Sequence, residues 1–287
     1  MLIIVLIIIA VCILGLILVW PGRGRRDRMQ DYMKRLIAHR GFHDNLGPAP
    51  ENSMAAYRLA VEKGLGIELD VRRTADGQLV CMHDRNVKRA AGVDRNIDEM
   101  NWPEVKELKL FRSDEGVPRF RDVLSYVDGR VPIIMEIKAE TFKDAIQTSS
   151  DAAALLDSYE GLLCMESFHP LAVWWFRKNR PRMLRGQLSD QFRDFKLHAK
   201  PLGFLLGCCA FNCFTKPDFI AYNVKRRNLL RFRLQHNAFH AVCAAWTVKS
   251  PEELISAAGD FDIFIFEGFD PGTVVLKSGA SGDGRGH

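Results

Sequence analysis

Three signatures of common protein classes are missing from this 287-residue chain. No glycine-rich GxGxxG turn follows the first apolar run, which argues against a doubly wound dinucleotide-binding sheet. The seven cysteines are odd in number and include no paired CxxC motif, so we expect neither a disulfide framework nor a zinc site. The net charge of +5 is mild for this length and does not indicate a nucleic-acid partner.

The cysteines are expected to serve as packing residues in a reducing compartment. Most of them lie inside apolar runs, where a thiol behaves as a small hydrophobe. Cys208, Cys209 and Cys213 are close in sequence but have no histidine pair nearby, which argues against a metal cluster.

Charge is also absent from residues 1–20, "MLIIVLIIIAVCILGLILVW". At about 1.5 Å per residue a helix of this length spans the ~30 Å hydrocarbon core, so we expect a transmembrane anchor. A cleaved signal peptide is the alternative, but no basic residue precedes the run and no small-x-small site follows it. Residues 21–33 begin with "PGRGRRDR" and form a basic linker, which predicts a single-pass cell-membrane protein with the rest of the chain after the linker in the cytoplasm.

Beyond the linker, short apolar runs alternate with helical patterns, as in repeated βα units. The runs are "RLIAH" (35–39), "GIELDV" (66–71), "QLVCMHD" (78–84), "VPIIMEIK" (131–138), "LLCMESF" (162–168), "RMLRGQL" (182–188), "DFIAYNV" (218–224), "HAVCAAWTV" (240–248) and "DIFIFEG" (262–268). They predict an α/β fold, a (β/α)8 TIM barrel over residues 34–275. The glycine- and serine-rich tail, residues 276–287, is expected to be disordered.

Side chains suited to catalysis stand where several of these runs end, and the carboxyl ends of barrel strands meet at one mouth. Because strand side chains alternate between faces, Glu68 and Asp70 share a face, as do Glu136 and Lys138. A lone histidine or one Glu-x-Asp pair is more often structural, but the whole set together points to a site. The set comprises His39, Arg40, Glu68, Asp70, His83, Glu136, Lys138 and Trp246.

This set suggests a phosphate-directed metal site. Glu68, Asp70 and Glu136 cannot all stay ionised in a low-dielectric pocket without a cation. All-oxygen ligation favours Mg²⁺, Ca²⁺ or Mn²⁺ and leaves His39 free to move a proton, while Arg40 holds an anion. The remaining histidines are expected to be surface or packing residues: His43, His169, His198, His236 and His240.

Six blocks in this order resemble the glycerophosphodiester phosphodiesterases, from about residue 34 to 270. They are "HRG" (39–41), "PENS" (50–53), "ELDVRRTADGQLVCMHD" (68–84), "EIK" (136–138), "SF" (167–168) and "AWTV" (245–248). The resemblance implies a (β/α)8 barrel with His39 and His83 as the general acid and base. It implies metal binding by Glu68, Asp70 and Glu136. It also implies phosphate contacts from Arg40 and Lys138 and packing of Trp246 against the alcohol part of the substrate.

The resemblance further implies a small insertion after the second barrel strand, about residues 84–117, with "QLVCMHD" as an accessory strand. Two blocks depart from the family pattern. The Thr-Asp pair that is frequent near the last strand is replaced by "IFEGFDP" (265–271), and the usual "WTVN" reads "WTVK", with Lys249.

The expected function is metal-dependent hydrolysis of glycerophosphodiesters to an alcohol and glycerol 3-phosphate. A lysophospholipase D acting on lysophospholipids at the membrane bilayer is one alternative. A non-catalytic phosphodiester-binding membrane protein is another, but the intact set of histidines and carboxylates argues against it. No nucleic-acid partner is expected.

The segment "AKPLGFLLGCCAFNCF" (199–214) is apolar and carries no acidic residue, yet it is shorter than the ~20 residues that cross a bilayer. One interpretation is a barrel helix packed with its cysteines and phenylalanines inward. The other is a partly exposed segment near the mouth, where Phe204, Leu205 and Leu206 let an acyl chain enter from the bilayer.

Overall fold

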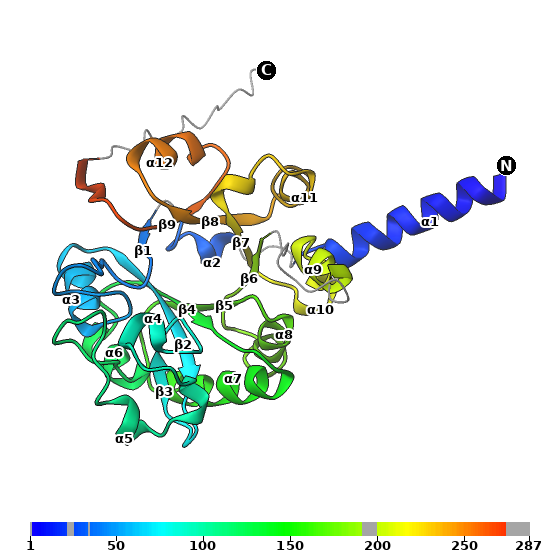
Figure 1. Cartoon of the computed structure of the whole chain (residues 1–287). Helices are drawn as coiled ribbons and strands as arrows, with labels where there is room; N and C mark the ends of the chain where they lie inside the picture. Colours follow the sequence, from blue (N-terminus) through cyan, green and yellow to red (C-terminus); the bar gives the residue numbers. More distant parts are fainter. Residues whose placement is uncertain (1, 22–25, 34, 191–199, 274–287) are drawn as a thin grey trace.

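The computed structural model describes residues 2–21, 26–33, 35–190 and 200–273, and its centre is a closed parallel barrel (Figure 1). Strand β1 pairs in parallel with both β9 and β2, which closes a ring of eight strands. The ring comprises β1 (Leu36–Ala38), β2 (Gly66–Arg73), β4 (Ile133–Ile137), β5 (Leu163–Ser167), β6 (Arg185–Ser189), β7 (Phe219–Asn223), β8 (Val242–Val248) and β9 (Ile263–Phe266). The (β/α)8 fold expected from the alternating runs is confirmed.

A ninth strand lies outside the ring. Strand β3 (Leu79–Cys81) pairs antiparallel with the end of β2, so "QLVCMHD" is an accessory strand. The residues that follow form a small subdomain with its own apolar cluster, which includes Val80, Val87, Ile97 and Leu110. Its helices are α4 (Lys88–Ala91), η1 (Ile97–Glu99) and α5 (Trp102–Val105). This subdomain occupies the stretch that the sequence assigned to an insertion.

Helices cover the outside of the ring, where their apolar faces are buried against the strands. Their starts follow the local sequence: the side chains of Thr141 and Ser250 accept hydrogen bonds from the first turns of α7 and α12, and Pro251 opens α12. These helices are α3 (Met54–Glu62), α6 (Phe120–Val127), α7 (Phe142–Leu156), α8 (Pro170–Asn179), α9 (Lys200–Gly207), α10 (Asn212–Thr215), α11 (Leu230–Arg233) and α12 (Pro251–Ala257). Short turns of helix complete the chain at η3 (Val224–Arg226), η4 (Leu234–Ala238) and η5 (Pro271–Thr273).

Part of the segment that the sequence assigned to a basic linker packs onto the barrel. Helix α2 (Arg26–Met29) and the turn after it bury Met29 and Tyr32 completely, in a cluster with Ile37 of β1 and Ile134 of β4. Because these residues immediately precede β1, they cover the amino end of the barrel. The opposite end therefore stays open for a site. The tail at residues 276–287 lies outside the described residues.

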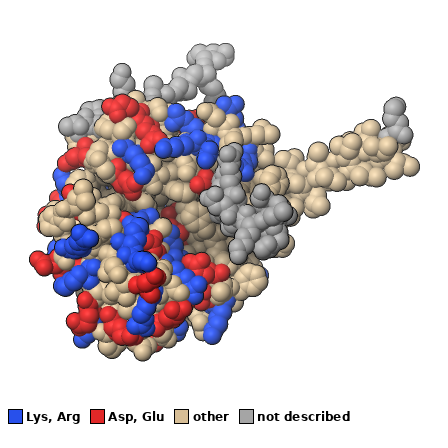
Figure 2. All heavy atoms as spheres, in the orientation of Figure 1, with Lys and Arg blue, Asp and Glu red and all other residues tan. Residues whose placement is uncertain are grey.

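Helix α1 (Leu2–Val19) projects away from the barrel beside α9 and α10 as a rod without charged side chains (Figures 1 and 2). Within the described residues it is the one helix long and apolar enough to cross a membrane, a test that a signal sequence near the N-terminus also passes. Its last turn is held by the barrel: the Asn212 and Gln235 side-chain amides both donate to the Val19 carbonyl at 3.0 Å. These bonds satisfy a carbonyl that a helix end otherwise leaves unpaired.

All seven cysteines are free thiols. Cys81, Cys164, Cys209 and Cys243 are buried, in line with the packing role expected from the sequence.

Candidate active site

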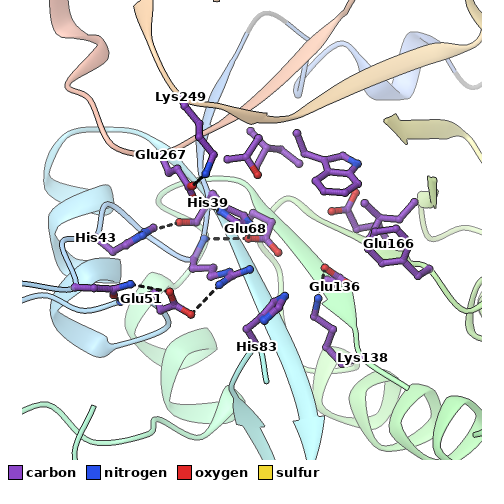
Figure 3. Close-up of a pocket in the computed structure, with 17 residues that line it drawn as sticks. His39, His43, Glu51, Glu68, His83, Glu136, Lys138, Glu166, Lys249 and Glu267 are labelled. Carbon is purple, nitrogen blue, oxygen red and sulfur yellow. Dashed lines mark hydrogen bonds and ion pairs between the residues drawn. The ribbon is translucent and has the colours of Figure 1, made fainter. Parts of the chain in front are cut away.

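The carboxyl ends of the barrel strands surround a pocket of about 360 Å³ (Figure 3). Seven of the residues predicted from the sequence line it: His39, Arg40, Glu68, His83, Glu136, Lys138 and Trp246. The eighth, Asp70, is fully buried and contacts both Arg40 and Lys138. The structure therefore brings the whole predicted set together, although its members span more than 200 residues of sequence.

Glu68, Asp70 and Glu136 each present a carboxylate oxygen, and these atoms lie within 4.8 Å of one another. The strand register explains this closeness, because Asp70 of β2 is opposite Glu136 of β4 and Glu68 lies two residues away on the same face. The Lys138 ammonium lies 3.0 Å from Asp70 Oδ1 and 2.8 Å from Glu136 Oε2.

Burial and mutual repulsion perturb these carboxyl groups. Burial, and then the charges of Asp70 and Glu136, raise the pKa of Glu68 well above its usual range. Burial also raises the pKa of Glu136 to about 6, although Lys138 opposes it. Burial acts in the same direction on Asp70, but the charges of Lys138 and Arg40 outweigh it and hold its pKa well below the usual range.

The residues present fit a hard divalent cation. Glu136 Oε1 is buried and accepts no hydrogen bond, so this oxygen is left without a partner. The donor set contains carboxylate oxygens alone, which is the ligation that Mg²⁺, Ca²⁺ and Mn²⁺ prefer.

The "HRG" block forms a tight left-handed turn after β1. Arg40 has φ +55° and Gly41 φ +82°, and a Cβ on Gly41 would come within 2.9 Å of Ala56. The turn aims the Arg40 backbone N–H at Glu68 Oε2, 2.9 Å away. Only glycine fits the second position without strain, so this glycine sets the geometry that orients a carboxylate of the cluster.

The "PENS" block forms hydrogen bonds to the charged side chains of Arg40 and Asp70. Glu51 accepts a hydrogen bond from Arg40 Nη1 at 2.7 Å, and Asn52 Nδ2 donates to Asp70 Oδ2 at 2.8 Å. Ser53 caps α3 by accepting from the Ala56 N–H at 3.1 Å. The three polar residues of the block therefore support Arg40, Asp70 and the start of α3.

His39 is oriented by a carboxylate that the sequence did not single out. Its Nδ1 lies 2.5 Å from Glu267 Oε2, and its Nε2 lies 3.9 Å from Glu68 Oε2. Glu267 follows β9, and its other oxygen lies 2.6 Å from Lys249 Nζ. The two positions that depart from the family pattern are thus in contact with each other, and one of them, Glu267, contacts His39.

Burial and the charge of Arg40 lower the pKa of His39, although its hydrogen bond to Glu267 opposes them. The imidazole is therefore neutral near pH 7. If Nδ1 donates its proton to Glu267, the lone pair of Nε2 faces the carboxylate cluster.

His83 lies across the pocket and has a similar support. Its Nδ1 lies 2.6 Å from Asp84 Oδ1, and Asp84 in turn accepts a hydrogen bond from Arg89. Burial, helped by the charges of Lys138 and Arg40 and opposed by that of Asp70, lowers the pKa of His83 to about 4. Two neutral, carboxylate-supported imidazoles thus line one pocket, an arrangement suited to moving protons at both ends of a reacting group.

The far wall of the pocket is aromatic. The ring of Trp246, in β8, meets Phe168 edge to face with centroids 5.5 Å apart, and both residues line the pocket. This wall offers an apolar surface to the part of a ligand that extends away from the carboxylates.

Three acidic residues that line the pocket were not predicted from the sequence: Glu51, Glu166 and Glu267. Glu166 lies in β5 opposite Glu136, lines the pocket, and is 1% exposed with Oε2 unpartnered. Burial and the charge of Glu136 raise its pKa well above the usual range. Glu166 and Glu267 stand at strand ends just as Glu136 does, so the strand-end rule finds both when it is applied to every apolar run.

One histidine expected to be a surface or packing residue is in the pocket. His43 lines it, with Nδ1 2.9 Å from the His39 carbonyl oxygen, so its dismissal from the site was wrong. His169 caps α8 by accepting from the Leu171 N–H, and His236 and His240 are not among the pocket-lining residues. His198 lies outside the described residues.

The model of the glycerophosphoryl diester phosphodiesterase family matches residues 39–257 of the chain. The chain is 34% identical over 123 residues to lysophospholipase D GDPD1 of Homo sapiens, covering 42% of this chain and 38% of that protein. It is 38% identical over 107 residues to a glycerophosphodiester phosphodiesterase of Caldanaerobacter subterraneus subsp. tengcongensis, covering 37% of this chain and 40% of that protein. The matches thus span about two fifths of the length of these relatives.

Solved structures share the fold over most of the chain. A phosphodiesterase from Oleispira antarctica in complex with the product sn-glycerol-3-phosphate superposes with a TM-score of 0.66 at 19% identity, covering 82% of this chain and 93% of that one. A glycerophosphodiester phosphodiesterase from Thermotoga maritima gives a TM-score of 0.61 at 22% identity, covering 80% and 93%.

Proposed function

Because this chain belongs to the glycerophosphoryl diester phosphodiesterase family, we propose that it hydrolyses glycerophosphodiesters to an alcohol and glycerol 3-phosphate. The observation that carries the proposal is the pairing of His39 and His83 in one pocket, each supported by a carboxylate, beside the Glu68, Asp70 and Glu136 cluster. That combination suits transfer of a phosphoryl group from an alcohol to water.

Glu68, Asp70 and Glu136 would hold one divalent cation, Mg²⁺, Ca²⁺ or Mn²⁺. When bound, the cation offsets the negative charge that builds up on the phosphoryl oxygens. Lys138 lies against two of these carboxylates and Arg40 against one, so both cations are placed to contact a phosphate bound beside the cluster.

The two histidines divide the proton transfers between them. One histidine enters the reaction neutral, and its Nε2 accepts a proton from the attacking hydroxyl group. The other enters as an imidazolium, protonated in the complex with the anionic substrate, and its Nε2 gives that proton to the departing alkoxide. The phosphorus–oxygen bond to the alcohol breaks and one to the incoming oxygen forms, so one water is consumed for each diester. Trp246 and Phe168 pack against the glycerol, the alcohol part of the substrate that stays bonded to phosphorus.

The full chain with glycerophosphocholine as substrate tests this function. We expect choline and glycerol 3-phosphate, loss of activity in chelator and recovery on addition of Mg²⁺, Ca²⁺ or Mn²⁺. Glu68→Gln should weaken metal binding, measured directly by calorimetry. His240→Asn is a matched control, because His240 is exposed, lies outside the pocket and has a positive φ that asparagine tolerates. Full turnover after exhaustive dialysis against chelator would rule out the metal-dependent mechanism.

A lysophospholipase D activity is the second candidate, and the apolar helix α1 favours it. The match to human lysophospholipase D GDPD1 supports it as well. A water-soluble diester gives no evident reason to hold an enzyme at a membrane, whereas a lysophospholipid lies in one.

Helix α1 anchors the protein as a single-pass segment, with the barrel in the cytoplasm. The two amide bonds to Val19 favour a retained anchor, since cleavage behind the helix would take the acceptor of both bonds away from the Asn212 and Gln235 amides. A reporter fused after residue 287 should be membrane-bound and cytoplasmic, and the purified protein should retain residues 2–19. A secreted product that begins near residue 21 would contradict both statements.

A further inference from the structure

An apolar groove of about 810 Å³ lies on the outer flank of the barrel, between the start of α8 and the α9–α10 segment. Its lining includes Phe142, Trp174, Leu202, Leu206, Phe211 and Phe214. No lysine or arginine is among the described residues that line it, and its one carboxylate, Glu140, is paired with Arg72 at 3.1 Å. The groove therefore suits an uncharged, apolar ligand, and its volume lies within the ~300–1,000 Å³ range of small-molecule sites.

The groove adjoins the catalytic pocket. Phe168 lines both cavities, since it follows β5 at the open end of the barrel, where it packs against Trp246. A molecule with its phosphate at the carboxylate cluster and an apolar tail would pass this residue to reach the groove.

The other end of the groove lies beside the anchor. Phe214 and Thr215 of α10 line it, and α10 contacts α1 through the bond from Asn212 to Val19. Figure 1 shows α1 leaving the barrel on this flank. Two lining side chains are strongly exposed, Phe142 at 75% and Phe214 at 60%, so the rim presents apolar surface where α1 would enter a bilayer.

We infer that this groove binds the single acyl chain of a lysophospholipid whose phosphodiester occupies the catalytic pocket. The inference rests on the proposed phosphodiesterase function and specifies its substrate class. Hydrolysis of a lysophosphatidylcholine breaks the bond between phosphorus and the choline oxygen, consumes one water, and gives choline and an acylglycerol phosphate. The glycerol and its chain stay on the side of Phe168 and the groove.

The structure also corrects the set of side chains assigned to an acyl chain from the sequence. Leu206 lines the groove, but Phe204 and Leu205 do not, being 66% and 41% exposed on α9. They are therefore a matched control pair for the groove residues.

The test uses the full chain in phosphatidylcholine vesicles and substrates labelled on choline. The deacylated diester is compared with hexanoyl, octanoyl and decanoyl lysophosphatidylcholine below their micelle concentrations. We expect kcat/KM to rise by up to about fourfold for each methylene that enters the groove. In Phe142→Ser/Phe214→Ser the ratio of decanoyl to deacylated kcat/KM should fall at least about tenfold, because both changes remove apolar contact area. Phe204→Ser/Leu205→Ser should keep the wild-type ratio, since partitioning into the vesicle affects all variants alike.

Failure of the inference is distinguishable from failure of the proposed function. Two results would overturn the acyl-chain role of the groove while leaving the phosphodiesterase function standing. One is hydrolysis of the deacylated diester with no increase in kcat/KM for the acylated substrates. The other is an equal fall in the decanoyl-to-deacylated kcat/KM ratio in both double variants. A decanoyl analogue with a photoreactive chain end gives a readout without turnover, and it should label peptides from α8 and α10. Labelling confined to α1, or unchanged in Phe142→Ser/Phe214→Ser, would overturn the inference even if the enzyme cleaved neither substrate.

Discussion

Replacing Glu267 by glutamine should leave His39 in place and remove most of the catalytic rate. The carboxylate lies 2.5 Å from His39 Nδ1, and it is itself held by Lys249 at 2.6 Å. An amide at this position can offer its NH₂ group to Nδ1, which moves the imidazole proton to Nε2 and blocks the nitrogen that faces the carboxylate cluster.

The size of the effect follows from what is lost. A correctly protonated general acid or base contributes about 10² to 10⁴ in rate, so Glu267→Gln should lower kcat by a factor in that range. Lys249 is 59% exposed, and an ion pair of that kind contributes at most about 1 kcal/mol, so Lys249→Gln should cost less than about tenfold.

The pH profile separates orientation from simple damage. Glu267 raises the pKa of His39 against the opposing effect of burial, so its loss should lower that pKa further. The limb of the kcat/KM profile that belongs to His39 should then move to lower pH in Glu267→Gln, while circular dichroism and the midpoint of unfolding change little. Glu267→Asp keeps the charge and should recover part of the rate. Activity within about threefold of wild type, with an unmoved limb, would refute the role given to Glu267.

Three further predictions follow from the same geometry. His83→Ala should lower kcat by about 10² to 10⁴ with folding intact, and wild-type turnover by that variant would remove His83 from the acid and base pair. Gly41→Ala should destabilise the protein by about 1–3 kcal/mol in denaturant unfolding, because the new Cβ would sit 2.9 Å from Ala56 at φ +82°; an unchanged midpoint would show that the turn relaxes freely. Burial opposes ionisation of Glu51, but hydrogen bonds from Arg89 and the charge of Arg40 outweigh it and lower its pKa from 4.5 to about 2. Ionised Glu51 thus stabilises the folded protein by up to about 3 kcal/mol above pH 4.5, and this stabilisation is lost as the pH falls through about 2. The difference in free energy of unfolding between wild type and Glu51→Gln should therefore shrink to zero over that pH window, and a difference independent of pH would contradict this.

The fold was predictable because the barrel strands are short apolar runs that alternate with helical patterns. The same regularity located the site, since parallel strands deliver their last side chains to one mouth. His39, Glu68, Asp70, Glu136, Lys138 and Trp246 come from such positions, whereas His83 follows the antiparallel accessory strand β3.

The contacts between side chains that lie far apart in the sequence could not be predicted, because they depend on how the folded chain brings those side chains together. The sequence shows Glu51 and Arg40 as separate charges, and the left-handed turn at Gly41 is what brings them into contact. Lys249 and Glu267 are 18 residues apart in sequence and meet only because β8 and β9 are neighbours in the ring. The groove likewise lies between α8 and the apolar segment at 199–214, which the sequence pattern could not assign to the core or to the surface. In the structure part of this segment is buried, as at Cys209, and part is exposed, as at Phe204.

The most direct test of the central claim is the identity and labelling of the phosphorus product. The full chain is supplied with glycerophosphocholine and Mg²⁺ in water labelled with heavy oxygen, and the products are identified by mass. Attack on phosphorus with choline as the leaving group predicts glycerol 3-phosphate carrying one labelled oxygen for each turnover, and unlabelled choline. Phosphocholine as the product, or glycerol 3-phosphate without label, would contradict the proposed reaction.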